Sequence, residues 1–222
     1  MGNDTMAFTA GDRDRLLADP KAFMDRVAIS VGQDCSKPTL IGKPDQLTFA
    51  DDPNVRGYRQ IDIGNDIGMD YVPAYLLRKK NGTDTVWFDA YLVEYEDNKT
   101  PITVLGQAAT LCFTANMNGC TFGIGSQGSP SGSLVVTHSN SRGHGSQEGN
   151  ISDQRLKAGF VVGTGGGLFE PEHYRTHGKQ SITFGFRKPG QKWQFCFLSY
   201  ARRSGIITNY GVRDIVTNQV QG

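Results

Sequence analysis

Two short runs near the middle of the chain show the alternation of apolar with polar or small residues that is typical of a β-strand. They are Thr121–Gly125 and 133–138. Successive side chains of a strand point to opposite faces, so this period of two indicates strands. The segment between them, SQGSPSG, consists of turn-forming residues and predicts a loop. We therefore interpret 116–140 as an antiparallel hairpin on which the rest of the chain is organised.

Strand patterns recur on both sides of this hairpin. Aromatic and β-branched residues predict strands at 71–78, 85–95, Thr103–Leu105, 109–115, 159–164, 181–187, 193–201 and 206–216. Asn81-Gly82 predicts a hairpin turn between the first two of these strands, and KPGQK predicts a turn before the strand at 193–201. The chain therefore enters and leaves the central hairpin through further strands.

A helical pattern precedes the strands. Residues 12–28 place apolar side chains roughly along one helical face, and Asp19 is the expected cap of a second helix that begins at Pro20. Residues 30–70 are rich in Gly, Asp, Pro and Asn and predict irregular structure with short strands. We expect a β-rich α+β fold, a β-sandwich with peripheral helices. It would form a single catalytic domain over 1–222, with a helical segment at 1–30 and a β-rich core at 71–220.

The central hairpin brings a thiol and an imidazole together. A turn centred on Ser129 would place Cys120 opposite His138 on one face, with the two Cβ atoms roughly 4.5–5.5 Å apart. An adjacent imidazolium lowers the pKa of a thiol from about 8.5 and produces a nucleophile. Gly119 would give the backbone the freedom for a tight turn, and the Cys120 N–H would face a developing oxyanion. The alternative remains that Cys120 is a buried hydrophobe and His138 ends a strand.

The run Asn118-Gly119-Cys120-Thr121, followed by a strand, a loop and Val135-Val136-Thr137-His138, resembles the catalytic motif of the cytotoxic necrotizing factor and Burkholderia lethal factor group. These bacterial toxins deamidate a glutamine side chain of a host protein. The resemblance implies that Cys120 is the nucleophile and His138 the base. It covers 116–140, and Met117-Asn118 stands where the family usually carries Leu-Ser. The family's targets are Rho-family GTPases or a translation-initiation helicase.

The predicted function is therefore that of a bacterial effector, a Cys–His deamidase that converts a target-protein glutamine to glutamate through a thioester. Such a reaction needs a group that orients the imidazole. The resemblance implies a backbone carbonyl, while Thr114, Asn116 and Asn140 are near enough in the chain to contribute. No metal or organic cofactor is required. The expected partner is a host protein that bears the glutamine, and we expect a monomer.

Two other classes of function remain open. The same dyad would serve a cysteine protease or a transglutaminase, although the chain has neither a papain-type Cys-Trp pair nor an evident downstream Asn partner. A non-enzymatic β-sandwich could instead bind carbohydrate or protein through Tyr71, Tyr75 and Tyr210, if these are exposed. That module makes no demand on Cys120.

Charge and hydropathy disfavour several partners. The chain has 222 residues with 23 basic and 22 acidic side chains, a net charge of +1. Nucleic acid and anionic membranes usually require a basic excess. The sequence shows no run of about 18 apolar residues and no signal peptide at its N-terminus. We therefore expect a soluble protein, secreted by a signal-independent route and acting in a host cytoplasm.

Other candidate ligands have the wrong spacing. The carboxylates of Asp51, Asp52, Asp62, Asp66 and Asp70 do not match a calcium-binding loop. His173 and His177 lie four apart without an HExxH motif, and Gly165-Gly166-Gly167 matches no phosphate-binding loop. Cys112 and Cys196 lie in apolar runs and are predicted core residues. The four cysteines of the chain, which also include Cys35 and Cys120, form no CxxC pair, so a structural zinc site is not predicted.

Overall fold

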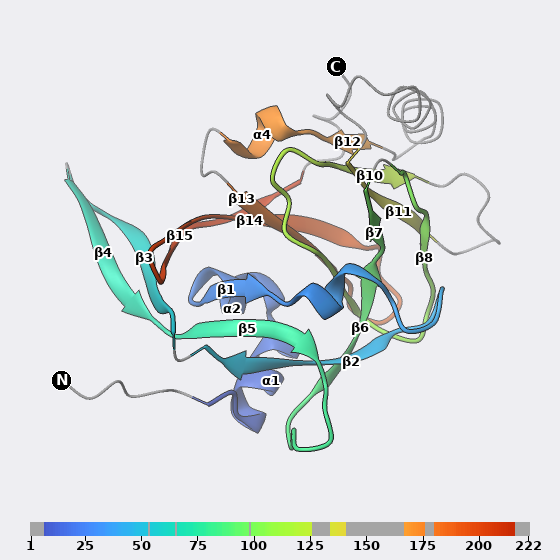
Figure 1. Ribbon diagram of the computed structural model, residues 1–222, viewed down its shortest axis with the longest axis horizontal. Helices are drawn as coiled ribbons and strands as arrows, with labels where there is room; N and C mark the ends of the chain where they lie inside the picture. The colour runs from blue at the N-terminus through green and yellow to red at the C-terminus, as the bar shows by residue number, and fades with distance from the viewer. Residues whose placement is uncertain are drawn as a thin grey trace.

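The structure is a computed structural model that describes residues 7–52, 54–64, 66–97, 99–125, 134–140, 167–175 and 180–215. Strands dominate these residues and are arranged in two sheets, with short helices beside them (Figure 1). The β-rich α+β fold is confirmed. No helix in the described ranges is long and apolar enough to cross a membrane.

The second N-terminal helix starts where the sequence predicts, whereas the first begins at Ala10, two residues before the predicted helical range, and the helical segment ends at Asp25. Helix α1 (Ala10–Ala18) begins after Thr9, whose hydroxyl accepts from the Asp12 N–H while the Asp12 carboxylate accepts from the Thr9 N–H. This reciprocal capping satisfies donors that have no partner in the first turn. Helix α2 (Pro20–Asp25) begins at Pro20, and the Asp19 carboxylate caps it by accepting from the Ala22 N–H at 3.0 Å. Two further short helices are the 3-10 helix η1 (Gln33–Ser36) and the α-helix α4 (Pro171–Arg175).

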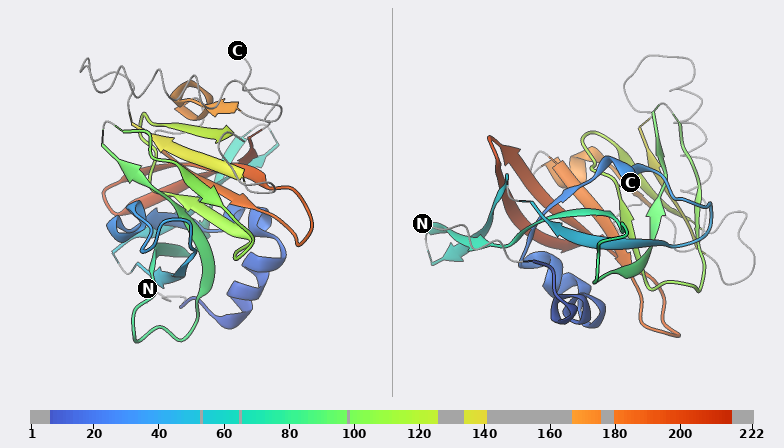
Figure 2. Two further views of the ribbon diagram at one scale, coloured as in Figure 1. Left: turned by 90° about the vertical axis from the view of Figure 1, so that its right-hand side faces the viewer. Right: turned by 60° about the horizontal axis from the view of Figure 1, so that its bottom comes forward.

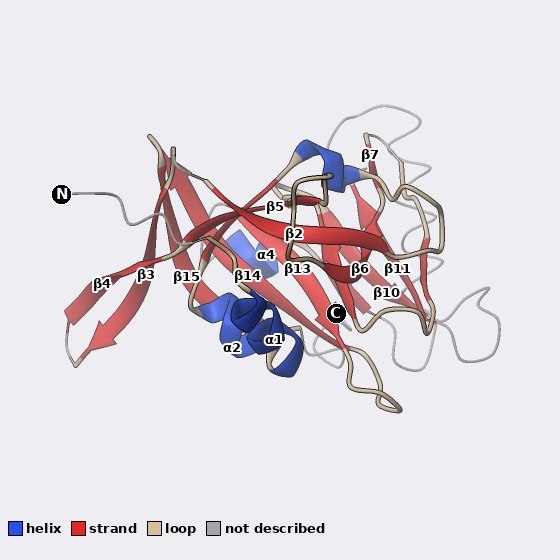
Figure 3. Cartoon of the chain, turned by 90° about the horizontal axis from the view of Figure 1, so that it is seen from below, coloured by secondary structure: helices blue, strands red, loops and turns tan. Residues whose placement is uncertain are grey.

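The larger sheet has ten strands. In spatial order they are β1 (Ala28–Val31), β5 (Ala74–Lys79), β2 (Asp45–Asp51), β6 (Phe88–Val93), β9 (Leu111–Thr114), β13 (Gln180–Phe186), β14 (Gln194–Arg203), β15 (Ile206–Asp214), β3 (Arg56–Ile63) and β4 (Asp66–Val72). The sheet curves until its first strand lies beside β3. There Gly57 is required, because a Cβ at that position would lie 2.7 Å from the Cβ of Ala28. Seen from below, the curvature leaves the two N-terminal helices against the sheet (Figure 3).

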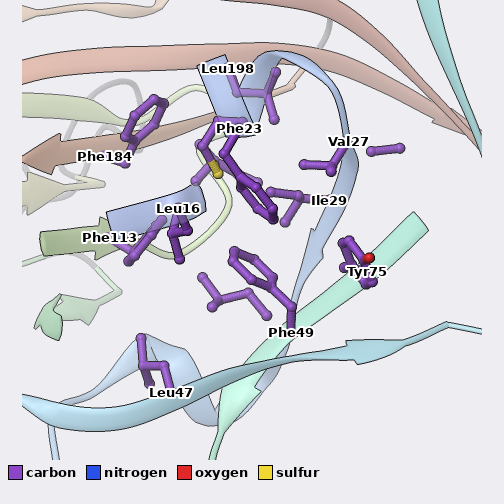
Figure 4. Packing of buried hydrophobic residues seen from close by; sticks show 14 of the residues in the cluster. Leu16, Phe23, Val27, Ile29, Leu47, Phe49, Tyr75, Phe113, Phe184 and Leu198 are labelled. Carbon is purple, nitrogen blue, oxygen red and sulfur yellow. The ribbon is translucent and has the colours of Figure 1, made fainter. Parts of the chain in front are cut away.

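The concave side of this sheet encloses the main core. Leu16 and Phe23 of the helices pack toward Phe49 of β2 and Phe113 of β9, and all four are buried (Figure 4). The ring centroids of Phe23 and Phe49 are 5.7 Å apart, a distance typical of favourable aromatic pairs. Burial of this apolar surface is the main force that holds helices and sheet together.

The smaller sheet has the order β12 (Gly167–Phe169), β10 (Thr121–Gly125), β11 (Leu134–Ser139) and β7 (Tyr95–Glu96), with β8 (Thr103–Leu105) also paired to β11. It packs on β14 through aromatic side chains, and Figure 2 shows it beside that part of the large sheet. The ring centroids of Phe122 and Phe195 are 5.5 Å apart, and those of Phe169 and Phe197 are 4.5 Å apart. These contacts form a second core.

Several predicted elements differ from the structure. Residues 30–70 contain β2, β3 and β4, so the expectation of mostly irregular structure is wrong there. The strand expected at 71–78 is divided between β4 and β5 at Pro73. Asn81-Gly82 does not close a two-strand hairpin, because β2 lies between β5 and β6. The hairpin of β13 and β14 is confirmed, with Gly190 at φ +76° in its turn. The strand expected at 159–164 lies outside the described residues.

Candidate functional site

The central hairpin forms, but its register differs from the prediction by two residues. Phe122 pairs with His138 and Ile124 pairs with Val136. If this register is continued by one residue pair beyond Thr121↔Ser139, Cys120 lies opposite Asn140. The Cys120 thiol donates to Asn140 Oδ1 at 3.8 Å. The predicted pairing of Cys120 with His138 is therefore wrong. A shift of two conserves the face of every side chain, so the thiol and the imidazole remain on one face as diagonal neighbours.

In this register Cys120 and His138 are diagonal neighbours and not directly opposed residues. Diagonal neighbours on paired antiparallel strands lie about 7–8 Å apart, a separation that aromatic and long side chains still bridge. The thiol in this structure is turned to Asn140 and not to His138. The thiol and the imidazole are therefore not hydrogen-bonded to each other in this structure.

Strand β7 extends the site on the far side of His138. Tyr95 is the parallel partner of His138, and their ring centroids are 4.8 Å apart. The Tyr95 hydroxyl donates to Asp97 Oδ1 at 2.5 Å and accepts from Asn140 Nδ2 at 2.8 Å. Asn140 Nδ2 also lies 3.0 Å from Asp97 Oδ1. A continuous hydrogen-bonded chain thus runs from the Cys120 thiol through Asn140 and Tyr95 to the Asp97 carboxylate.

The imidazole of His138 has an unusual environment. It is fully buried, and neither Nδ1 nor Nε2 has a hydrogen-bond partner among the described residues. Burial lowers the pKa of His138 to about 3, because the charged imidazolium would lose its hydration. The ring is therefore neutral at physiological pH. An unpaired polar group in such a position is costly, and a catalytic role is one of the explanations for it, beside strain or a bound water or ion.

The thiol of Cys120 is also held neutral. Its residue is only 4% exposed. Burial raises the pKa of the Cys120 thiol to about 11, and the nearby Asp97 carboxylate adds to the rise, while the Asn118 backbone and Arg175 oppose it. The arrangement is thus a neutral thiol beside a neutral imidazole. Proton transfer from sulfur to nitrogen would have to accompany the attack on a substrate.

A tyrosine from the short helix α4 holds the backbone before the thiol. The Gly119 N–H donates to the Tyr174 hydroxyl at 2.8 Å, and that hydroxyl donates to the Cys120 carbonyl oxygen at 3.0 Å. Gly119 has φ +97°, and a Cβ there would lie 2.9 Å from Arg175 Nη2. The predicted need for glycine at this position is confirmed. The Tyr174 hydroxyl thus acts as a clamp that joins the two backbone groups on either side of the Gly119–Cys120 peptide bond.

The three candidates for the orienting group have different environments. Asn140 contacts the thiol, as described above. Thr114 is committed elsewhere, because its hydroxyl donates to the Thr183 carbonyl at 3.2 Å and accepts from the Thr183 N–H at 3.0 Å. Asn116 is exposed. The sequence offered no signal for Tyr95, Asp97 and Tyr174, because each comes from an element other than the hairpin.

The remaining candidates do not form a second site. All four cysteines are buried free thiols. His173 Nδ1 accepts from the Glu170 N–H at 2.9 Å, and His177 lies outside the described residues. No group of three metal-ligating side chains occurs within the described ranges. Tyr75 is only 3% exposed whereas Tyr71 is 59% exposed, so the aromatics proposed for a binding module do not share one accessible surface.

The chain matches no protein-family model, and no curated protein matches it significantly. Functional inference therefore rests on the residues of the site.

Proposed function

We propose that the protein is a Cys–His amidohydrolase that converts a glutamine side chain of a target protein to glutamate. The observation that carries the proposal is the buried imidazole of His138, which has no hydrogen-bond partner among the described residues and shares a face with the Cys120 thiol on the adjoining strand. The resemblance of 116–140 to the deamidase toxins supports the same pair. The same resemblance supports a β-sandwich, in which the smaller sheet packs on the larger one at β14.

The proposed reaction uses both neutral groups. The Cys120 sulfur attacks the carboxamide carbon as His138 accepts the thiol proton. The imidazolium then donates that proton to the leaving nitrogen, and ammonia departs as the C–N bond breaks. Water, deprotonated by His138, attacks the thioester and releases glutamate with the free thiol. The clamp from Tyr174 would hold the Gly119–Cys120 peptide during these steps.

The proposed biological role follows the resemblance. A bacterial effector of this kind would act on a host protein after export by a signal-independent route. Replacement of one neutral amide by a carboxylate would change the charge of a regulatory side chain. Rho-family GTPases and a translation-initiation helicase are the first substrates to test.

The test begins with thiol reactivity. Folded protein is treated with iodoacetamide from pH 5 to pH 9, and modified cysteines are mapped by mass spectrometry in the wild type, His138→Ala and Asn140→Ala. Because burial raises the pKa of the Cys120 thiol to about 11, its alkylation depends on proton transfer to His138. We therefore expect Cys120 to be labelled faster than the other three cysteines at the same pH, an excess that is lost in His138→Ala and retained in Asn140→Ala. The buried thiols of Cys35, Cys112 and Cys196 are internal controls.

Activity is then measured as glutamine-to-glutamate conversion in the candidate substrates by intact mass and peptide mapping. Conversion by wild type and its loss in both Cys120→Ser and His138→Ala are expected. If Cys120 reacts only after the protein unfolds, the dyad is refuted.

A further inference from the structure

We propose that the free edge of β4 binds an extended segment of another protein, one that presents apolar side chains on one face and lysine or arginine on the other. This site is separate from Cys120 and is independent of the proposed deamidase activity. The hairpin of β3 and β4 reaches away from both cores in Figures 1 and 3. Its backbone, its apolar side chains and its charges each favour this partner.

The backbone of β4 is available for pairing. β4 is the last strand of the ten-stranded order, and no strand in the described ranges pairs with its outer side. Its inner side pairs with β3 from Gly57↔Val72 to Ile63↔Asp66. Unpaired N–H and C=O groups at a sheet edge accept an added strand, and natural edges are usually protected by charged side chains, especially lysine, by proline or by a bulge. The β4 sequence, DIGMDYV, contains neither lysine nor proline, and its charged residues are Asp66 and Asp70.

The apolar face of β4 is exposed. Ile67 is 68% exposed, Met69 is 49% exposed and Tyr71 is 59% exposed. These residues alternate along the strand and therefore share a face. Ile63 of β3 is also 58% exposed, but it pairs with Asp66 and lies on the other face of the hairpin, so these three residues form the apolar row of β4 itself. A contiguous exposed apolar row of this kind marks an interaction surface.

The opposite face of β4 is acidic. Asp66 and Asp70 alternate with the apolar row, and neither has an ion-pair partner among the described residues. The cross-strand neighbour of Asp70 is Arg59, but Arg59 forms its salt bridge with Asp25. An added strand would place its own side chains about 4.5–5.5 Å from these carboxylates. Lysine or arginine there would be stabilised, and aspartate or glutamate would be repelled.

The charges also argue against a second copy of this chain. In a parallel pair of β4 strands in register, Asp66 and Asp70 would each face the same residue of the other copy. In an antiparallel pair centred on Met69, Ile67 would face Tyr71, but Asp70 would lie diagonally beside Asp66 and Asp70 of the other copy. Either arrangement that aligns the apolar faces juxtaposes carboxylates, which is destabilising. A basic strand from a different protein avoids this conflict.

The test uses two labelled peptides and the full-length protein. One peptide alternates valine with lysine over the length of β4, and the control peptide carries glutamate in place of each lysine. Binding is followed by fluorescence anisotropy. Two cross-strand charge pairs at about 0.5–1 kcal/mol each correspond to roughly tenfold in Kd. We therefore expect the lysine peptide to bind roughly tenfold more tightly than the glutamate peptide.

Matched variants locate the binding. Ile67→Thr keeps a β-branched residue and should weaken binding of the lysine peptide, whereas Ile41→Thr, at a position that is 78% exposed elsewhere, should leave it unchanged. Asp66→Asn with Asp70→Asn should remove the preference between the peptides. Equal binding of both peptides to the wild type, or an equal effect of the two threonine variants, would overturn the proposal. So would a dimer in sedimentation velocity that Ile67→Thr dissociates, because the occupant would then be a second copy.

Discussion

Replacement of Tyr174 by phenylalanine tests the clamp that holds the backbone at Gly119 and Cys120. Tyr174 is fully buried, and its ring packs 5.5 Å from that of Phe169, a contact that phenylalanine retains. The variant therefore removes only the hydroxyl. Two hydrogen bonds are lost with it, one from the Gly119 N–H and one to the Cys120 carbonyl oxygen.

The expected loss follows from these two bonds. Each contributes about 1 kcal/mol net, and a buried backbone group left without a partner costs about 1–3 kcal/mol. Tyr174→Phe should therefore destabilise the protein by about 2–4 kcal/mol. For a domain of this size each kcal/mol corresponds to about 2–4 °C in Tm. A fall of at least about 4 °C is expected.

Urea unfolding followed by tryptophan fluorescence measures this loss, with the m value required to stay constant. Tyr71→Phe is the matched control, because Tyr71 is 59% exposed and its change should remain within about 0.5 kcal/mol. A loss in Tyr174→Phe no larger than that of the control would contradict the clamp. Under conditions in which both proteins remain folded, the rate of iodoacetamide labelling of Cys120 should differ between Tyr174→Phe and the wild type, since the Gly119 N–H and the Cys120 carbonyl are no longer held.

Two further variants test buried polar groups. His138→Phe removes a titrating ring whose pKa is lowered by burial to about 3 in the folded protein. In the unfolded chain the histidine takes up a proton near pH 6.5. The stability that the wild type gains from keeping this ring neutral is therefore fully present above pH 6.5 and is lost as the pH falls toward 3. The wild type should thus lose roughly 2 kcal/mol relative to the variant between pH 6.5 and pH 5, at about 1.36 kcal/mol per pH unit, and parallel stability curves would show that His138 is not buried in the neutral form. Asn209→Ala should cost about 3 kcal/mol in urea unfolding, because the fully buried Asn209 amide donates to the Met24 and Val27 carbonyls and accepts from the Gly211 N–H. The exposed Asn116→Ala is its control, and an equal effect of both would refute this role of Asn209.

Local patterns located many of the elements correctly. The bounds of β8 and β10 agree with the alternation of side chains, and α2 begins at Pro20 with Asp19 as its cap. These features depend on neighbouring residues in the chain, since the backbone conformation of proline and the reach of a capping carboxylate are local properties. The face shared by Cys120 and His138 was likewise predictable, because it follows from the period of the strand.

The pairing of those elements depended on contacts between distant segments. Alternation repeats every two residues, so it cannot distinguish a hairpin in which Cys120 faces His138 from one in which it faces Asn140. β2 lies between β5 and β6 although Asn81-Gly82 is a good turn sequence, because strand order is set by the burial of whole faces and not by one turn. For the same reason Tyr95 reaches Asn140, and Tyr174 reaches the backbone at Gly119 and Cys120, from outside the hairpin. Their positions depend on packing against the second core, which the local sequence does not determine.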